Sequence, residues 1–198
     1  MILGKKSIYK YLLNMNFPNF KIKLNGNISK AFLKIKINNF QQACEYIKNI
    51  RYQRISVKSN LLLVLEEKRG TCSSKHALLK KLAEENNIND IELKIGIYKM
   101  TAKNTPGLEN LIPKNISFIP EAHAYLVFYK NKLDFTRINS KPLQNEDILK
   151  EISLTADEMI SKKDQIHKNF MKKWCQKNNL DFNKIWLIRE SCIKKLST

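Results

Sequence analysis

The chain has 198 residues, of which 43% are hydrophobic and 27% charged, and its formal net charge is +18. This composition excludes a disordered chain, and the length allows one domain with its own core. The longest apolar run, 61–65, is too short to cross a bilayer, so we expect no membrane partner. The start, MILGKKSIYKYLLNMNF, lacks an apolar core segment and a cleavage site, so we expect a cytoplasmic protein.

The charge of +18 would suit a nucleic-acid partner. The lysines are nevertheless scattered along the chain, and lysine, asparagine and isoleucine share AT-rich codons, so a low-GC genome explains their number. No zinc finger, aromatic RNA-binding box or basic region with heptads is present in the sequence. We therefore do not favour nucleic acid as a partner.

The four cysteines differ in their sequence context. No two of them form a CxxC pair, so we expect no structural zinc and no cofactor. A reducing compartment also argues against disulfides. Cys44, Cys175 and Cys192 lie inside helical patterns and are predicted to be core thiols, whereas Cys72 stands at the start of a helix.

The first part of the chain is predicted to be mostly irregular. Residues 1–37 are basic, and KIKLNGNIS within them could form a hairpin. Residues 38–49 place apolar side chains on one helical face, and 51–57 has an extended pattern. Ser59 is the predicted cap of a short helix that ends before Gly70.

The helix predicted for 72–86 has Thr71 or Ser73 as its N-cap. One face should be buried, because apolar and small side chains repeat there at helical spacing. That stripe consists of Cys72, His76, Leu79 and Ala83, widened by Leu78 and Leu82.

A sheet should follow this helix. IELKIGIYKM alternates as a strand, and Thr101 to Asn115 form a long connection that could act as a lid or specificity element. EAHAYLVFY, KN and KLDFTRI read as strand, turn and strand. From 144 to 197 the pattern is helical, so we predict an α+β fold in one domain, with a core over about 38–140 and a C-terminal helical extension.

Cys72 has the context of a reactive thiol. Unpaired N–H groups and the dipole at a helix N-terminus favour the thiolate, and they could also stabilise an oxyanion. Gly70 would let a substrate backbone come close. A thiolate used as a nucleophile needs a histidine and a third group that orients the histidine.

Three histidines are candidates for that role. His167 lies in a lysine-rich helix and is predicted to be on the surface, and His76 shares a helix with Cys72 and is predicted to be structural. His123 opens a strand, and Asp134 starts DFT within the next one. Cysteine on a helix with histidine and aspartate on neighbouring strands is the arrangement of papain-like thiol enzymes.

The stretches RGTCSSKHALLKKLAEENNI and EAHAYLVFYKNKLDFT resemble the bacterial transglutaminase-like superfamily over about Tyr52 to Arg137. The resemblance implies a papain/transglutaminase-like core, in which a cysteine-bearing helix packs on an antiparallel sheet. It also implies Cys72 as nucleophile, His123 as base and Asp134 as orienting carboxylate. The superfamily includes cross-linking acyltransferases, peptide or amide hydrolases and members without activity.

We therefore expect a thiol-dependent acyl-transfer enzyme, in the first place a hydrolase with a peptide or amide substrate. The alternative is an inactive transglutaminase-like module with a basic surface for nucleic acid or an acidic partner. A metal site formed by Cys72, His76 and His123 has no usual zinc spacing.

The sequence offers more than one candidate for two parts of the site, namely the residue that orients His123 and the side chain of the oxyanion hole. If Lys130 and Asn131 form a two-residue turn, Val127 pairs with Asp134, and His123 lies four residues or about 13 Å further along the strand. Glu121 and Asn139 are therefore alternatives to Asp134. Gln53 and Asn60 are the candidate side chains for an oxyanion hole.

Overall fold

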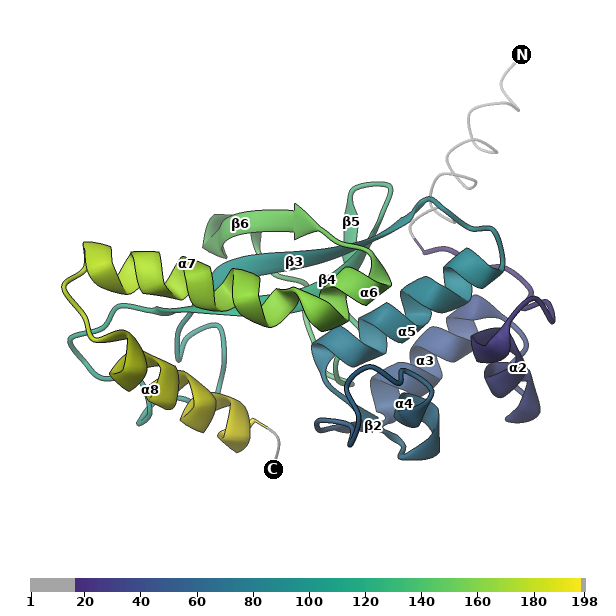
Figure 1. Cartoon of the computed structure of the whole chain (residues 1–198), viewed down its shortest axis with the longest axis horizontal. Coiled ribbons are helices and arrows are strands. Elements are labelled where there is room, and N and C mark those ends of the chain that lie inside the picture. Colours follow the sequence, from purple (N-terminus) through teal and green to yellow (C-terminus); the bar gives the residue numbers. More distant parts are fainter. Residues whose placement is uncertain (1–16, 197–198) are drawn as a thin grey trace, which may run out of the picture.

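A four-stranded antiparallel sheet, in the order β5-β4-β3-β6, lies at the centre of the fold (Figure 1). The structure is a computed structural model, and it describes residues 17–196. The strands are β3 (Ile91–Met100), β4 (Ile119–Phe128), β5 (Asn131–Leu133) and β6 (Ile148–Ser153). Helices on both sides of these strands in the chain give the mixed α/β class that the order of sequence patterns predicted.

The long strands β3 and β4 form because apolar residues alternate on them. They pair along their whole length, with Ile95 opposite Ala124 and Gly96 opposite His123. Ile95 and Ala124 are fully buried against the helices. Because successive side chains of a strand point to opposite faces, His123 lies on the other face of the sheet.

Helix α5 (Cys72–Glu85) packs on β3 and β4. Its predicted stripe is confirmed, since Leu78, Leu79 and Leu82 are completely buried. Burial of each such leucine contributes about 1.5–3 kcal/mol relative to exposure. Around α5 lie the N-terminal elements (Figure 1): α2 (Asn27–Lys34), α3 (Phe40–Asn49), β1 (Arg51–Tyr52), α4 (Leu63–Glu66) and β2 (Arg69–Gly70).

The C-terminal helices are α6 (Ala156–Ser161), α7 (Lys163–Lys177) and α8 (Phe182–Lys195), and a 3₁₀ turn (Asn145–Asp147) precedes β6. Helix α6 packs on α5, while α7 packs on β4 and α8 (Figure 1). Met171, Cys175 and Ile185 from α7 and α8 form a second core with Met100 and Ile119 at the far ends of β3 and β4.

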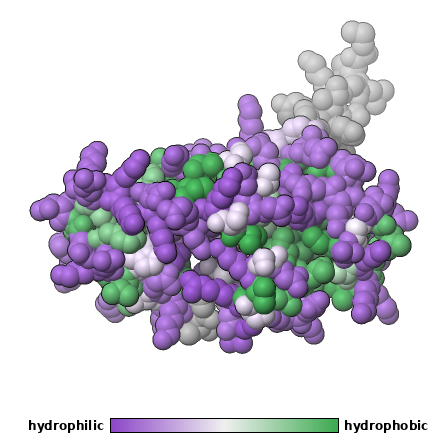
Figure 2. All heavy atoms as spheres, in the orientation of Figure 1, coloured by the Kyte–Doolittle hydropathy of each residue, from purple (hydrophilic) through white to green (hydrophobic). Residues whose placement is uncertain are grey.

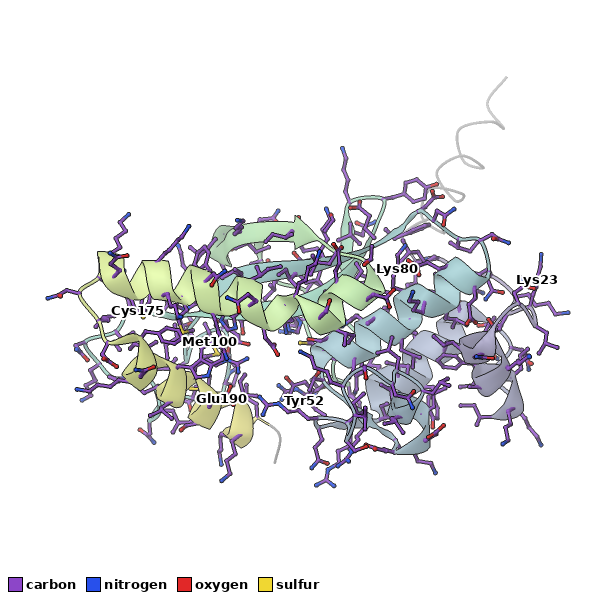
Figure 3. The ribbon with its side chains drawn as sticks, in the orientation of Figure 1. Lys23, Tyr52, Lys80, Met100, Cys175 and Glu190 are labelled. Atoms are coloured by element: carbon purple, nitrogen blue, oxygen red, sulfur yellow. The ribbon has the colours of Figure 1, made fainter. Side chains whose placement is uncertain are left out.

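Ion pairs help to attach α8 to the rest of the molecule. Arg189 donates two hydrogen bonds of 2.6 Å to the buried carboxylate of Glu121 on β4. At the surface, Arg54 forms a 3.2 Å ion pair with Glu190, which is labelled on α8 in Figure 3.

The structure corrects the prediction for residues 1–37. Residues 1–16 lie outside the described residues, and the segment predicted as a hairpin leads into helix α2. Amphipathic spacing explains the helix, because Ser29 and Phe32 are buried one turn apart. Ser59 is also not a cap, since α4 begins only at Leu63.

The prediction of helix directly after residue 144 is wrong as well. ILKEIS forms strand β6, which pairs with β3 at the edge of the sheet and has half-buried and exposed side chains. The prediction of a surface histidine at 167 is also wrong, since His167 is buried in α7 and bonds the carbonyl of Pro120 at 2.8 Å. Cys44, Cys175 and Cys192 are buried thiols, as predicted.

Hydrophilic side chains cover most of the face drawn in Figure 2, and the apolar ones form several separate patches. Between residues 17 and 196, none of the helices has the length and apolar character needed to cross a membrane.

Candidate active site

The chain turns sharply from strand to helix at Cys72. Strand β2 pairs in parallel with β1, with Tyr52 opposite Gly70, and α5 starts two residues later. Thr71 is the N-cap, as predicted, and its N–H donates to the Ser74 hydroxyl at 3.0 Å. Cys72 is therefore the first residue of the helix, where unpaired N–H groups and the dipole favour negative charge.

His123 and Asp134 meet across the hairpin of β4 and β5. Nε2 of His123 lies 2.8 Å from Oδ2 of Asp134. The other carboxylate oxygen of Asp134, Oδ1, accepts the Thr136 N–H at 2.9 Å. Both members of this predicted pair are thus brought together. Of the two alternatives, Glu121 is bonded to Arg189, and Asn139 lines the nearby cavity.

The register of the hairpin explains why this contact is possible. Phe128 pairs with Asn131, so the turn consists of Tyr129 and Lys130, both with positive φ. The predicted turn at Lys130 and Asn131 was one residue off. Asp134 consequently follows the strand two residues from His123 rather than four, about 7 Å along the strand, which the two side chains can span.

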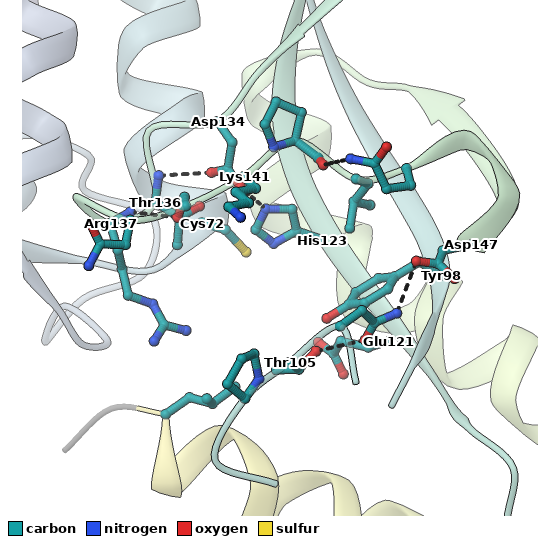
Figure 4. Close-up of a pocket in the computed structure, with 18 of the residues that line it drawn as sticks. Cys72, Tyr98, Thr105, Glu121, His123, Asp134, Thr136, Arg137, Lys141 and Asp147 are labelled. Carbon is teal, nitrogen blue, oxygen red and sulfur yellow. Dashed lines mark hydrogen bonds and ion pairs between the residues drawn. The ribbon is translucent and has the colours of Figure 1, made fainter. Parts of the chain in front are cut away.

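The Cys72 thiol lies beside the His123 ring (Figure 4). The His123 side chain and the backbone N–H of Ala124 both act on this thiol and lower its pKa. Because Nε2 faces Asp134, the remaining nitrogen, Nδ1, is the one available to sulfur. Cys72, His123 and Asp134 therefore form a continuous chain of contacts.

A second cation contacts the sulfur. The Lys163 ammonium, at the start of α7, lies 3.5 Å from Sγ of Cys72 and 2.9 Å from the Ser73 hydroxyl, and Lys163 is buried. The lysine-rich sequence around this residue gave no prediction for it. The buried stripe at helical spacing could have identified it: Lys163, His167, Met171 and Cys175.

These contacts shift the protonation of the site. Burial alone would raise the pKa of Cys72, but Lys163 and His123 lower it to about 5. Burial would lower the pKa of His123, but Asp134 and the thiol raise it to about 10. Burial would raise the pKa of Asp134, and the imidazolium holds it well below its usual range. At neutral pH the site is a thiolate–imidazolium pair oriented by a carboxylate.

His76 supports the site from below, as predicted for a structural histidine. It is fully buried, and burial lowers its pKa to about 4, so the ring is neutral. Its Nε2 accepts the Phe135 N–H at 2.8 Å, which leaves Nδ1–H to donate to the Cys72 carbonyl at 2.8 Å. His76 thereby connects the start of the cysteine helix to the residue after Asp134.

Lys75 makes a second connection of this kind. Its buried ammonium donates to the carbonyls of Ile50 and Thr136 at 2.7 and 2.8 Å. A Cβ atom at position 70 would lie only 2.9 Å from Cγ of Lys75, so a larger residue than Gly70 would clash with the Lys75 side chain. Gly70 thus makes room for Lys75 and does not line the cavity, which corrects the expectation that it admits substrate.

Cys72 and His123 line a cavity of about 480 Å³ (Figure 4). The long connection after β3 contributes Lys103 to Pro106, and the segment after β5 contributes Asn139 to Gln144. Neither Gln53 nor Asn60 lines this cavity: Gln53 lines a neighbouring one, and Asn60 accepts the Leu62 N–H. The backbone N–H of Cys72 remains the candidate oxyanion donor.

In the part of the chain that the structure describes, no three histidine, cysteine, aspartate or glutamate side chains are grouped so as to hold a metal ion. Comparison of the chain with protein-family models, with curated proteins and with solved structures finds no match.

Proposed function

We propose that this protein is a thiol-dependent acyl-transfer enzyme of a transglutaminase-like, papain-type fold, and that it hydrolyses an amide or peptide bond. The observation that carries the proposal is the contact chain from the Cys72 thiol through His123 to Asp134 at the wall of an open cavity. The low pKa of Cys72 supports it, because the thiolate is the nucleophilic form.

In the first half-reaction the Cys72 thiolate attacks the substrate carbonyl carbon and forms a C–S bond. The carbonyl oxygen takes the negative charge, and the Cys72 N–H at the start of α5 would stabilise it. The His123 imidazolium then gives a proton to the leaving nitrogen as the C–N bond breaks. The products are an amine and a thioester on Cys72.

In the second half-reaction the neutral His123 takes a proton from water, whose oxygen attacks the thioester. The C–S bond breaks, the carboxylic acid leaves, and the thiolate–imidazolium pair is restored. Asp134 holds the ring in place and stabilises its charged form throughout. An amine in place of water would give cross-linking by the same steps.

The proposal is tested by alkylation of Cys72 with iodoacetamide at pH 6, followed by mass spectrometry of the peptide that contains it. A thiol with a pKa near 5 is mostly thiolate at this pH, whereas an unfolded thiol is about 0.3% thiolate. Lower intrinsic nucleophilicity offsets part of this gain. We expect native Cys72 to react about tenfold faster than urea-unfolded Cys72, and His123→Gln to remove most of the advantage.

If native Cys72 reacts no faster than the unfolded thiol, the enzyme proposal is wrong. The alternative, an inactive module with a basic surface, would then predict retention on nucleic acid that weakens steeply with salt.

A further inference from the structure

Two of the carboxylates that line the cavity beside Cys72 are paired with cations, whereas three other cations of the cavity have no carboxylate partner among residues 17–196. Asp134 is paired with His123, and Glu121 accepts two 2.6 Å hydrogen bonds from Arg189. These two carboxylates therefore contribute little net negative charge to the cavity. Three cations also line it, namely Lys103, Arg137 and Lys141, and none of the carboxylates within residues 17–196 bonds to their side chains.

The third carboxylate of the cavity lies at its other end. Asp147 accepts a 3.1 Å hydrogen bond from the Asn104 amide and sits beside Tyr98 in Figure 4. Arg137 extends into the cavity on the opposite side, near Cys72 (Figure 4). The end of the cavity that holds the nucleophile is thus the positive end.

Arg137 is held in place by an aromatic ring rather than by an anion. Its guanidinium carbon lies 4.6 Å from the centre of the Tyr52 ring, and the residue is half-buried. A guanidinium stacked on a ring keeps its edge N–H groups available, and these match the two oxygens of a carboxylate. The stacking therefore fixes the orientation of a carboxylate-binding group without using its donors.

We propose that Arg137 forms an anion subsite, and that the substrate is an amide or peptide with a carboxylate close to the bond that is cleaved. Lys141 adds positive charge at the same opening. The inference rests on the proposed function, because it assigns the substrate class of that same site. The carboxylate is either an acidic side chain or a chain terminus.

Two small alkylating reagents test the subsite without a known substrate. Iodoacetate carries a carboxylate next to its reactive carbon, and iodoacetamide is its neutral counterpart. We expect the ratio of their rates at Cys72, iodoacetate over iodoacetamide, to be about tenfold higher in the native protein than in the urea-unfolded chain. Arg137→Gln should bring the ratio close to the unfolded value.

The matched control is Arg51→Gln, which removes one positive charge at an exposed position outside the cavity. It should change the ratio less than twofold, because screened surface charges act weakly at a distance. Arg137→Lys, which keeps the charge, should retain a ratio above that of Arg137→Gln. The subsite is refuted if the native ratio does not exceed the unfolded ratio, or if Arg51→Gln lowers it as much as Arg137→Gln.

Protection experiments then identify the source of the carboxylate. N-acetylglutamate α-amide carries only a side-chain carboxylate, and N-acetylalanine carries only a terminal one. The compound that slows alkylation more strongly identifies the source, and no protection beyond that of N-acetylglutamine α-amide also refutes the subsite. The iodoacetamide rate alone tests the enzyme proposal, so failure of the two proposals is distinguishable.

Discussion

The charge state of Cys72 depends on groups from several elements. His123 of β4 and Lys163 of α7 contact the sulfur, and the N-terminus of α5 adds the helix dipole. The charge of the thiolate in turn acts on three other titratable groups, namely Tyr52, Lys75 and Tyr98. The thiolate is therefore held between two cations rather than by the helix start alone.

We expect Lys163→Met to raise the pKa of Cys72. Loss of the contacting ammonium leaves burial, which favours the neutral thiol, opposed by His123, the Ala124 N–H and the N-terminus of α5. The midpoint of the iodoacetamide rate against pH should move from near 5 upward by about one to two units. The thiolate is lost as pH falls through the pKa, so the variant should react more slowly than wild type near pH 6.

Lys162→Met is the matched control for this variant. Lys162 precedes Lys163, but its ammonium pairs with Glu158 at the surface, so the midpoint should not move. Lys163→Arg should keep the midpoint below that of Lys163→Met, because it keeps the charge. An unshifted midpoint in Lys163→Met would contradict the assignment of this lysine to the thiolate.

The sequence predicts some residues of the site and misses others for a physical reason. Cys72, His123 and Asp134 each have a local signature, which is a helix start or a strand end. Arg137 has none, because it acts only through a contact with a distant part of the chain, and Lys163 is marked only by the buried stripe of its helix. His167 was predicted to be exposed because lysines surround it in the sequence, although it belongs to the buried face of α7.

At the scale of elements, the hairpin of β4 and β5 decides whether His123 meets its carboxylate. The sequence did not place the turn correctly, because neither Tyr129 nor Lys130 is a residue typical of positive φ. Their φ values of 44° and 68° are those of a two-residue hairpin turn. Asn131, which attracted the prediction, is instead the first residue of β5.

This geometry predicts that Lys130→Gly stabilises the protein. Glycine adopts a φ of 68° without the clash that a side chain causes, so the free energy of unfolding should rise by about 0.5–1 kcal/mol. Urea denaturation at neutral pH measures the change. At Lys150, an exposed position within β6, the same substitution should instead lower stability by about 0.5–1 kcal/mol. A destabilised Lys130→Gly would mean that the turn has another register.

Strand β6 shows why the sequence did not predict helix or strand correctly in every segment. ILKEIS spaces its apolar residues, Ile148, Leu149 and Ile152, at i, i+1 and i+4, so its pattern continued the helical one that follows. Its strand conformation comes from pairing with β3, which is a long-range contact. By contrast, β3, β4 and α5 were predicted correctly, because each buries a complete apolar pattern of its own.

For the whole molecule, the contact between α8 and the sheet is a buried ion pair. Glu121 lies on β4 two residues before His123, and the Arg189 guanidinium from α8 binds both of its oxygens. Burial would raise the pKa of Glu121, but Arg189 lowers it to about 2. A carboxylate with a depressed pKa contributes stability above its unfolded pKa near 4.3, and this is lost as pH falls to about 2.

We expect Arg189→Met to lower the free energy of unfolding by about 3–5 kcal/mol at pH 7, because it leaves the Glu121 carboxylate buried without its cation. The double variant Glu121→Gln with Arg189→Met should recover a large part of this loss. Urea denaturation between pH 7 and 2 measures both. Between pH 4.5 and 2 the free energy of unfolding of the wild type should fall by up to about 3 kcal/mol because of this carboxylate. In the double variant this contribution should be missing, so its free energy of unfolding should fall by about 3 kcal/mol less.

Arg54→Met is the control, because it removes a surface ion pair of α8. The Arg54 side chain is 70% exposed, so its pair with Glu190 is screened by water and should contribute less than about 1 kcal/mol. Equal losses of stability in Arg54→Met and Arg189→Met would contradict a special role for the buried pair.

Since Glu121 and His123 share one strand and one face, Arg189→Met should also slow alkylation of Cys72, whereas Arg54→Met should not.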